Sequence, residues 1–224
     1  MPNGEVVDSV FPEDSDGDLY KLAVWYEFNT ATSQVLGTAD SREAYLTLYT
    51  TTGGEKKRAR YRWNWQPRAL HGTANDYTNL YLLIETANAP AGPSYTRNLD
   101  NLADLENWMR TFGLEHALGN WDSFGFRNHQ NMFAYKPEHG PWSLLIWDIN
   151  IIFGGGTRGA PIATNEGLLE FDSGDTGLTA ILNQPASRRA YWRSLQDLTE
   201  GPLLNANVDP VMDARFNAFA AAGV

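Results

Sequence analysis

Cysteine is absent from the 224 residues of the chain. Disulfide bonds and thiolate metal sites are therefore excluded, and nothing in the sequence indicates a redox compartment. No apolar run approaches the roughly 20 residues of a membrane-spanning helix, so we expect no membrane span. The opening residues, MPNGEVVDSV, lack a basic segment followed by an apolar one, so we also expect no signal peptide within this chain.

Basic residues are scarce. The 17 lysines and arginines face 27 aspartates and glutamates, which gives a net charge of −10 at pH 7 and disfavours nucleic acid and anionic membranes as general partners. The histidines show no H-x-x-x-H spacing, so a zinc hydrolase has little support. No G-x-S-x-G motif indicates a hydrolase nucleophile elbow. The glycines at 154–156 lack the lysine of a phosphate loop.

Aromatic residues are plentiful, with 8 tryptophans, 10 tyrosines and 10 phenylalanines. This content indicates an aromatic-rich core or an aromatic-lined cleft. The length suits a single domain over residues 1–224 and is sufficient to bury most of the apolar surface. The acidic residues 1–17 are expected to be extended. We predict an α+β fold that is dominated by helices and has a few antiparallel strands.

Short apolar runs between turn residues predict the strands. Residues 19–28 form one strand, residues 44–51 and 57–65 form a hairpin around Gly53 and Gly54, and residues 132–135 and 143–147 form a second pair. Apolar residues at helical spacing predict the helices. These cover residues 76–88, a longer segment that begins at Asn98 or Asp100 and includes Phe112, and residues 168–171, 178–182, 187–198 and 210–222.

Polar residues crowd into the segment 119–154. Asp122 and Asp148 each follow a tryptophan, and between them lie Arg127, Asn128, His129, Gln130 and Asn131. A hydrophobic core has no use for so many polar side chains along one short path, so we predict a polar site. In many phosphoryl-transfer sites, one carboxylate ahead of a turn serves as a base and a second one at a strand end holds a metal ion.

This segment resembles the CotH-type spore-coat protein kinases, an atypical kinase family that is secreted or surface-associated. The matching residues are Asn120, Trp121, Asp122, then Asn128, His129, Asn131, then Pro141, Trp142, and finally Trp147, Asp148, Ile149, Asn150, Phe153, Gly154. Residues 17–21, GDLYK, are similar to the family's G-N-L-Y-K strand, and residues 178–198 are similar to its closing helices. Asn150 stands where the family commonly has a second aspartate. Because an amide oxygen also coordinates magnesium or calcium, Asn150 is kept as a candidate metal ligand.

The resemblance implies a C-terminal kinase lobe that transfers phosphate from ATP to a protein hydroxyl, with magnesium or manganese as cofactor. It also implies a coat or extracellular protein as substrate, and a location outside the cell or on the cell or spore surface. We expect the small N-terminal lobe to be absent, because none of Lys21, Lys56 and Lys57 matches the motif of its nucleotide-gripping lysine. This expectation favours a competing interpretation, an inactive pseudokinase or a surface- or carbohydrate-binding module.

The two aspartates and one asparagine each have a functional and a structural interpretation. Asp122 is predicted to be the catalytic base or a turn cap. Asp148 is predicted to be a metal ligand, because a charge at the end of an apolar strand contributes nothing to the strand. Asn128 follows Asp122 by six residues, which is close to the spacing of the metal-binding asparagine in protein kinases, although a turn asparagine fits equally.

The neighbouring polar residues have supporting roles in this hypothesis. Arg127 offers a planar donor fork for phosphate, while pairing with a nearby carboxylate is the commoner arrangement for such an arginine. His129 either contacts phosphate of the cofactor or holds the loop. Asn131 directly precedes a predicted strand, where its amide would organise the two aspartates.

Two charged segments lie outside this region. Residues 13–18, EDSDGD, alternate carboxylates as calcium loops do, but the glycine and glutamate positions of an EF-hand are not matched, which favours a solvated turn. Residues 56–65 predict a strand that has Tyr61, Trp63 and Trp65 on one face and arginines on the other. Such a strip would suit phosphates or sugars, but an ordinary half-buried strand whose arginines pair with the protein's own carboxylates is the simpler interpretation.

A glycoside hydrolase is the runner-up enzyme class. It needs two carboxylates about 5 to 10 Å apart, and Asp122 with Asp148 would meet that requirement if they lie close together. The tryptophans would suit a sugar cleft.

Overall fold

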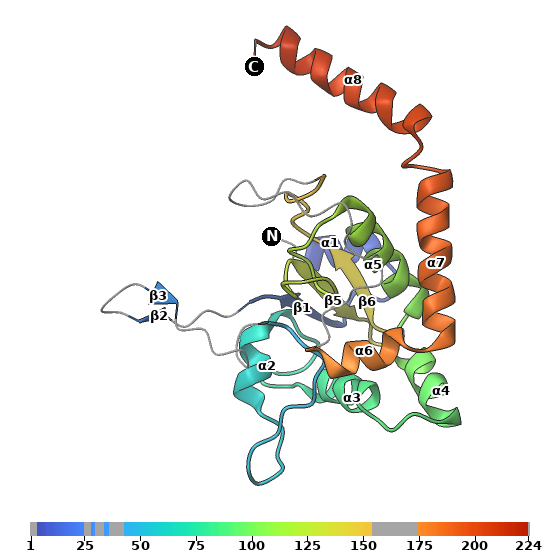
Figure 1. The fold of residues 1–224 in the computed structure, drawn as a ribbon. Coiled ribbons are helices and arrows are strands. Elements are labelled where there is room, and N and C mark those ends of the chain that lie inside the picture. Colours follow the sequence, from blue (N-terminus) through green and yellow to red (C-terminus); the bar gives the residue numbers. More distant parts are fainter. Residues whose placement is uncertain (1–3, 25–27, 30–33, 36–42, 154–173, 224) are drawn as a thin grey trace.

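A computed structural model describes residues 4–24, 28–29, 34–35, 43–153 and 174–223. It has the predicted α+β architecture, with an antiparallel four-stranded sheet packed against helices (Figure 1). The strands are β1 (Asp18–Leu22), β4 (Trp65–Ala69), β5 (Met132–Lys136) and β6 (Ser143–Ile146), in the order β4-β1-β5-β6. A separate pair joins β2 (Phe28–Asn29) to β3 (Gln34–Val35).

The register of the sheet brings four strand ends together. Leu22 pairs with Trp65 of β4 and with Met132 of β5, and Met132 pairs in turn with Ile146 of β6. These four residues therefore lie at one end of the sheet, which we call the Leu22 end. The β5–β6 hairpin confirms the strands predicted at 132–135 and 143–147, whereas the strand predicted at 19–28 stops at Leu22.

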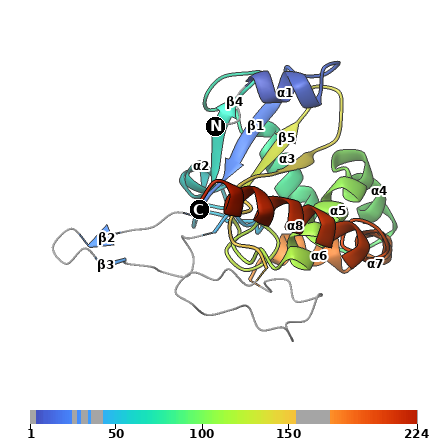
Figure 2. The ribbon, with the colours of Figure 1, turned by 90° about the horizontal axis from the view of Figure 1, so that it is seen from above.

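The two faces of the sheet bury different side chains, as the alternation along a strand requires. Tyr20, Leu22 and Ala134 belong to the main core. Helices complete that core: α3 (Thr78–Ala87), α4 (Pro93–Leu102), α5 (Leu105–Leu118), α6 (Thr176–Leu182) and α7 (Pro185–Glu200). Leu19 and Phe133 lie on the opposite face. Figure 2 shows α4, α5, α6 and α7 grouped together, with α1 apart from them.

The expectation that residues 1–17 are extended is wrong, because Gly4–Val10 form the helix α1. This helix buries Val7, which packs with Leu19, Phe133 and Tyr135 on the second face of the sheet. The acidic composition of the segment gave no sign of this contact. Phe11, directly after the helix, packs on the same face with its ring 4.7 Å from that of Tyr135, so burial of these two apolar side chains holds the short helix against the sheet.

The predicted strand at 57–65 is also wrong. Arg58–Asn64 form the helix α2, and β4 begins only at Trp65. Of the predicted hairpin, the structure retains a bridge between Thr50 and Lys56. The helix turns Tyr61 inward and leaves Trp63 51% exposed, whereas a strand would have placed both on one face. A run this short fits both the helical spacing and the alternation of a strand, so the tertiary contacts of Tyr61 decide between helix and strand.

The long helix predicted from Asn98 or Asp100 is two helices, because the chain breaks between α4 and α5. The Asp104 side chain caps α5 by accepting a hydrogen bond from the backbone N–H of Asn107 at 3.0 Å, and Ala103 bridges to Trp142. The helices predicted at 76–88, 178–182, 187–198 and 210–222 agree with α3, α6, α7 and α8 (Asn205–Ala221).

The C-terminal helix α8 buries none of its residues and extends away from the body of the molecule in Figure 1. The helix predicted at 168–171 and the glycines at 154–156 lie outside the described residues. Within the described ranges, no helix has the length and apolar character needed to cross a membrane.

Candidate active site

The chain enters the candidate site from the end of α5. Gly119 ends this helix with a φ of 72°, in the left-handed region that glycine adopts without strain. Asn120 is fully buried and donates a hydrogen bond to Oε2 of Glu115 at 2.7 Å. The Ser123 hydroxyl donates to the Asn120 carbonyl at 2.8 Å. These bonds fix the residues around Asp122 against the last turn of α5.

The carboxylate of Asp122 is held by three side-chain amides, which we call the amide cradle. Asn128 and Gln130 donate to its Oδ1, the latter at 2.6 Å, and Asn131 donates to its Oδ2 at 2.7 Å. The Asp122 side chain is nearly buried, and its orientation is fixed by these bonds. The cradle residues directly precede β5, so the start of that strand fixes where they hold the carboxylate.

His129 lies between the cradle residues in sequence but points into the interior. It is fully buried with a φ of 36°, and its ring meets those of Tyr45 and Phe124 edge-on at centroid distances of 4.7 and 5.7 Å. Its Nδ1 lies 3.9 Å from Oδ2 of Asp175. Burial keeps this ring away from solvent and from any phosphate there, so the surroundings favour the loop-holding interpretation over contact with phosphate.

Asp175 connects this loop to a distant helix. It is fully buried, caps α6 through the Leu178 N–H at 3.0 Å and accepts from the Leu46 N–H at 2.7 Å. Burial raises the pKa of the Asp175 carboxyl to about 7, against the lowering effect of these backbone hydrogen bonds. The carbonyl of His129 accepts from the Ala44 N–H at 3.1 Å, so the segment at 44–46 is tied to both residues.

Asp148 lies just beyond β6, at the Leu22 end of the sheet. Because Met132 pairs with Ile146, the cradle residue Asn131 and the segment that carries Asp148 leave the sheet at the same end. Asp148 is exposed and has a φ of 58°, and Asn150 is exposed as well. The chain then returns to α5, where the Phe153 N–H donates to the carbonyl of Leu118 at 2.8 Å.

The structure thus brings most of the predicted residues to one end of the sheet. Asp122 and Asn128 are in direct contact, and Asp148 and Asn150 lie on the loop that leaves the same end. The Arg127 side chain is exposed, while its backbone N–H donates to the Trp121 carbonyl at 3.2 Å.

The side chains at this end include oxygen atoms of the kind that divalent cations of the magnesium type prefer. Such cations prefer oxygen ligands and are commonly bound by one or two carboxylates together with substrate phosphates. Asp148 supplies a carboxylate and Asn150 an amide oxygen. The side-chain amide nitrogen of Asn128 is directed at Asp122, so the amide oxygen of Asn128 is a further candidate metal ligand. Three or more His, Cys, Asp or Glu side chains do not cluster as a metal site among the described residues.

The acidic run at 13–18 has structural partners. Asp14 accepts from the N–H groups of Glu138 and His139 at 2.8 and 3.0 Å. Asp18 accepts from the His71 N–H at 3.0 Å and from the Asn79 side chain at 2.8 Å. These carboxylates brace loops around the sheet, so their contacts are those of structural turns.

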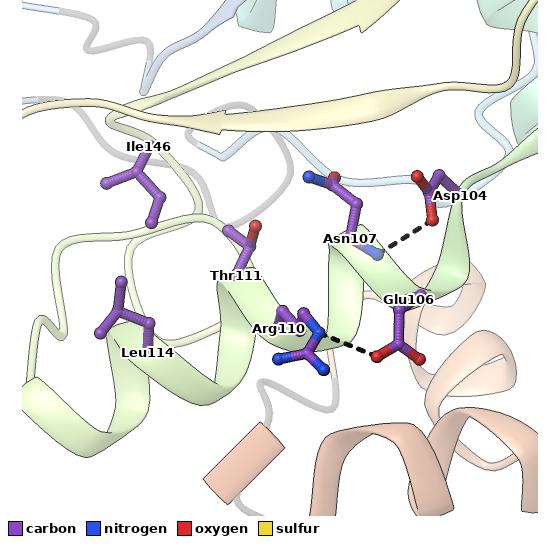
Figure 3. Close-up of a pocket in the computed structure, with 7 residues that line it drawn as sticks. All are labelled: Asp104, Glu106, Asn107, Arg110, Thr111, Leu114 and Ile146. Carbon is purple, nitrogen blue, oxygen red and sulfur yellow. Dashed lines mark hydrogen bonds and ion pairs between the residues drawn. The ribbon is translucent and has the colours of Figure 1, made fainter. Parts of the chain in front are cut away.

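A hollow of about 410 Å³ opens between α5 and the end of β6 (Figure 3). Several of its polar side chains are already paired, since Arg110 binds Glu106 at 2.8 Å and the Asn107 N–H binds Asp104. None of the predicted site residues lines it. We therefore define the candidate site by the amide cradle and the Asp148 loop, and not by this hollow.

Three features of the site were not assigned from the sequence. Gln130 belongs to the polar run, and its position between Asn128 and Asn131 was the signal that could have assigned it to the site. The buried pair of Glu115 and Asn120 was hidden in a helical pattern. Asp175 is separated from His129 by 46 residues, the difference between positions 175 and 129, so no local pattern could connect them.

Comparison with known families identifies the family of the chain. The family model described as CotH kinase protein matches residues 8–221, nearly the whole chain. The chain therefore belongs to the CotH kinase protein family. No curated protein matches the chain.

Glu115 provides a test of the packing behind Asp122. Burial raises the pKa of its carboxyl from 4.5 to about 7, because the Asn120 amide offsets only part of the lost hydration. The folded state then binds the proton more tightly than the unfolded state. The free energy of unfolding should fall by about 2 to 3 kcal/mol as pH rises from about 4.5 to about 7.

We expect Glu115→Gln to remove that part of the pH dependence, since glutamine cannot ionise and still offers an acceptor to Asn120. Urea denaturation at several pH values would measure it, with Glu5→Gln on the exposed surface of α1 as the matched control. An unchanged slope in Glu115→Gln would show that the pKa of this carboxyl is the same in the folded and unfolded states.

Proposed function

We propose that this chain is a metal-dependent protein kinase domain that transfers the γ-phosphoryl group of ATP to a protein hydroxyl. The observation that carries the proposal is the amide cradle, which orients a nearly buried carboxylate at the end of the sheet where a second carboxylate emerges. Membership of the CotH kinase protein family supports it.

Asp122 is the proposed catalytic base. A carboxylate offers roughly four acceptor positions on its two oxygens, and the cradle uses three of them. The remaining position would accept the hydrogen bond of the substrate hydroxyl. As the hydroxyl oxygen bonds to phosphorus and the bond from phosphorus to ADP breaks, the hydroxyl proton passes to Asp122.

Asp148, Asn128 and Asn150 are the proposed metal ligands. Magnesium or manganese held there would neutralise charge on the nucleotide phosphates. Arg127, which is exposed beside the cradle, is a proposed phosphate contact. The resemblance to spore-coat kinases supports coat or extracellular proteins as the proposed substrates, and the spore or cell surface as the proposed location.

The experiment that tests the proposal is transfer of labelled γ-phosphate to a hydroxyl-rich acceptor protein. We expect incorporation that needs magnesium or manganese and stops when a chelator is added. Incorporation that is unaffected by chelation would contradict the metal role. Absence of incorporation with every metal and acceptor would contradict kinase activity.

A second candidate function is nucleotide binding without transfer. Two observations favour it: Asn150 brings no charge to the proposed metal site, and three amides already occupy most of the acceptor capacity of Asp122. Metal-dependent ATP binding with no phosphate incorporation would identify this case. Sugar release from soluble polysaccharides that vanishes in Asp122→Asn would instead support a glycoside hydrolase.

A further inference from the structure

The outward side of α2 carries a basic and aromatic surface that the proposed chemistry does not use. Lys57, Arg58 and Arg62 are exposed there beside Trp63, which is 51% exposed. We call these four residues the α2 basic face. Arg58 and Arg62 are one helical turn apart, so both guanidinium groups lie on the same side of the helix. In a chain of net charge −10, such a grouping is unusual.

Within the described ranges, the positive charges of this face are not paired with carboxylates. Arg58 and Arg62 form no ion pair with any residue in the described ranges, in contrast to Arg110 and Arg193, which both pair with Glu106. A hollow of about 420 Å³ is lined by Arg58, Ala59, Arg62 and Trp63. Among the described residues, the side chains that line it are thus two cations, a small residue and an indole, with no carboxylate.

Arg58 also lines a second hollow of about 550 Å³, together with Glu55, Lys56 and Tyr81. The Tyr81 ring stacks on that of Tyr77 at a centroid distance of 5.9 Å. Both phenol hydroxyls are buried and have no hydrogen-bond partner in the part of the chain that the structure describes. Glu55 adds a carboxylate to this second hollow and Lys56 pairs with Glu85 at 2.5 Å, so its charge is mixed. The guanidinium groups of Arg58 and Arg62 at the first hollow therefore carry the case for an anionic ligand with several oxygens.

The α2 basic face is joined to the candidate active site. Asn64, the last residue of α2, exchanges two hydrogen bonds with Ala23, at 3.0 Å through its carbonyl and at 2.8 Å through its side-chain amide. The next residue, Val24, donates to the Gln130 side chain at 3.4 Å, and Gln130 holds Asp122. The β4 strand that follows α2 also starts at the Leu22 end of the sheet. The face and the amide cradle are thus connected at one end of the molecule.

We propose that the α2 basic face docks an acidic segment, rich in aspartate and glutamate, of the protein substrate. Guanidinium groups bind carboxylates through paired hydrogen bonds, and the Trp63 ring would cover the apolar parts of the bound peptide. A positive face on an otherwise negative protein also selects and orients an acidic partner during encounter. The substrate role rests on the proposed kinase function, whereas the binding itself does not.

The test is fluorescence anisotropy with a labelled glutamate- and aspartate-rich peptide, a lysine-rich peptide of equal length and a single-stranded oligonucleotide. We expect the wild-type chain to bind the acidic peptide best, with an affinity that falls as salt is added. Arg58→Glu combined with Arg62→Glu should weaken that binding at least about tenfold.

The matched control is Arg97→Glu combined with Arg189→Glu, on the exposed surfaces of α4 and α7, because it changes the net charge by the same amount. Equal weakening in both double variants, or no weakening in either, would overturn the docking site. Tighter binding of the oligonucleotide would overturn the choice of an acidic peptide.

The same titrations in Asp148→Ala separate the two proposals. If Asp148→Ala no longer binds nucleotide but still binds the acidic peptide, the docking site is supported. The proposed kinase function is then judged separately, by the phosphate-transfer assays. Loss of peptide binding in Asp148→Ala would contradict a docking site that is independent of the metal ligands.

Discussion

Substitution of Asp122 by asparagine is expected to lower the rate of phosphoryl transfer by about 10²- to 10⁴-fold. Asparagine cannot take the proton of the attacking hydroxyl. Its amide nitrogen would also face a cradle made entirely of amide donors, because Asn128, Gln130 and Asn131 all donate to the carboxylate in the native protein. The measurement is the initial rate of labelled phosphate incorporation at saturating ATP.

The amide nitrogen of the new asparagine would face the amide donors of the cradle, which should lower the free energy of unfolding by about 1 to 3 kcal/mol. A control variant must therefore lose a similar amount of stability. Asp14→Asn is suitable. Asp14 accepts hydrogen bonds from the backbone N–H groups of Glu138 and His139, and it braces a loop outside the site. We expect this control to be destabilised and to retain its transfer rate. A rate in Asp122→Asn that matches the control would remove Asp122 from catalysis.

Replacement of Trp65 by alanine is expected to destabilise the protein by about 3 to 5 kcal/mol. Trp65 is fully buried at the start of β4, where its ring meets those of Tyr20, Phe124 and Trp142 edge-on at centroid distances of 6.0 to 6.5 Å. Its indole N–H donates to the Tyr45 carbonyl at 3.3 Å. Total stabilities of domains are about 5 to 15 kcal/mol, so much of the protein would unfold under mild denaturant.

The matched control is Trp63→Ala, two positions earlier on the exposed side of α2. We expect this change to alter stability by no more than about 0.5 kcal/mol. Urea denaturation followed by circular dichroism would compare the two variants. Equal losses would indicate that both rings share one buried face, as in the strand predicted from the sequence, and would contradict the helix α2.

The sequence predicted those parts of the fold in which local pattern and packing agree. The β5–β6 hairpin and the helices α3, α6, α7 and α8 lie where their apolar spacing placed them. The helix α1 was missed because its contact with the sheet depends on a few apolar residues, Val7 and the following Phe11, within an acidic segment. The helix α2 was missed because seven residues with arginine at alternate positions fit both the helical and the strand period. The burial of Arg60, Tyr61 and Asn64 distinguishes the two.

Part of the candidate site was also predicted from the sequence, and part was not. Polar crowding indicated Asp122, Asn128 and Asp148, and the sheet register brings their loops to one end. The inward turn of His129 could not be predicted, because it depends on a φ of 36° and on Asp175, which arrives from a distant helix. The α2 basic face was likewise visible only once the helix had separated Arg58 and Arg62 from the buried Arg60.

The central claim is that Asp148 helps to hold a metal ion for nucleotide binding, and calorimetric titration with ATP tests it most directly. We predict binding that requires magnesium or manganese and is lost in Asp148→Ala, while Asp100→Ala on the exposed surface of α4 binds as the wild type does. Metal-dependent binding that persists unchanged in Asp148→Ala would contradict the account.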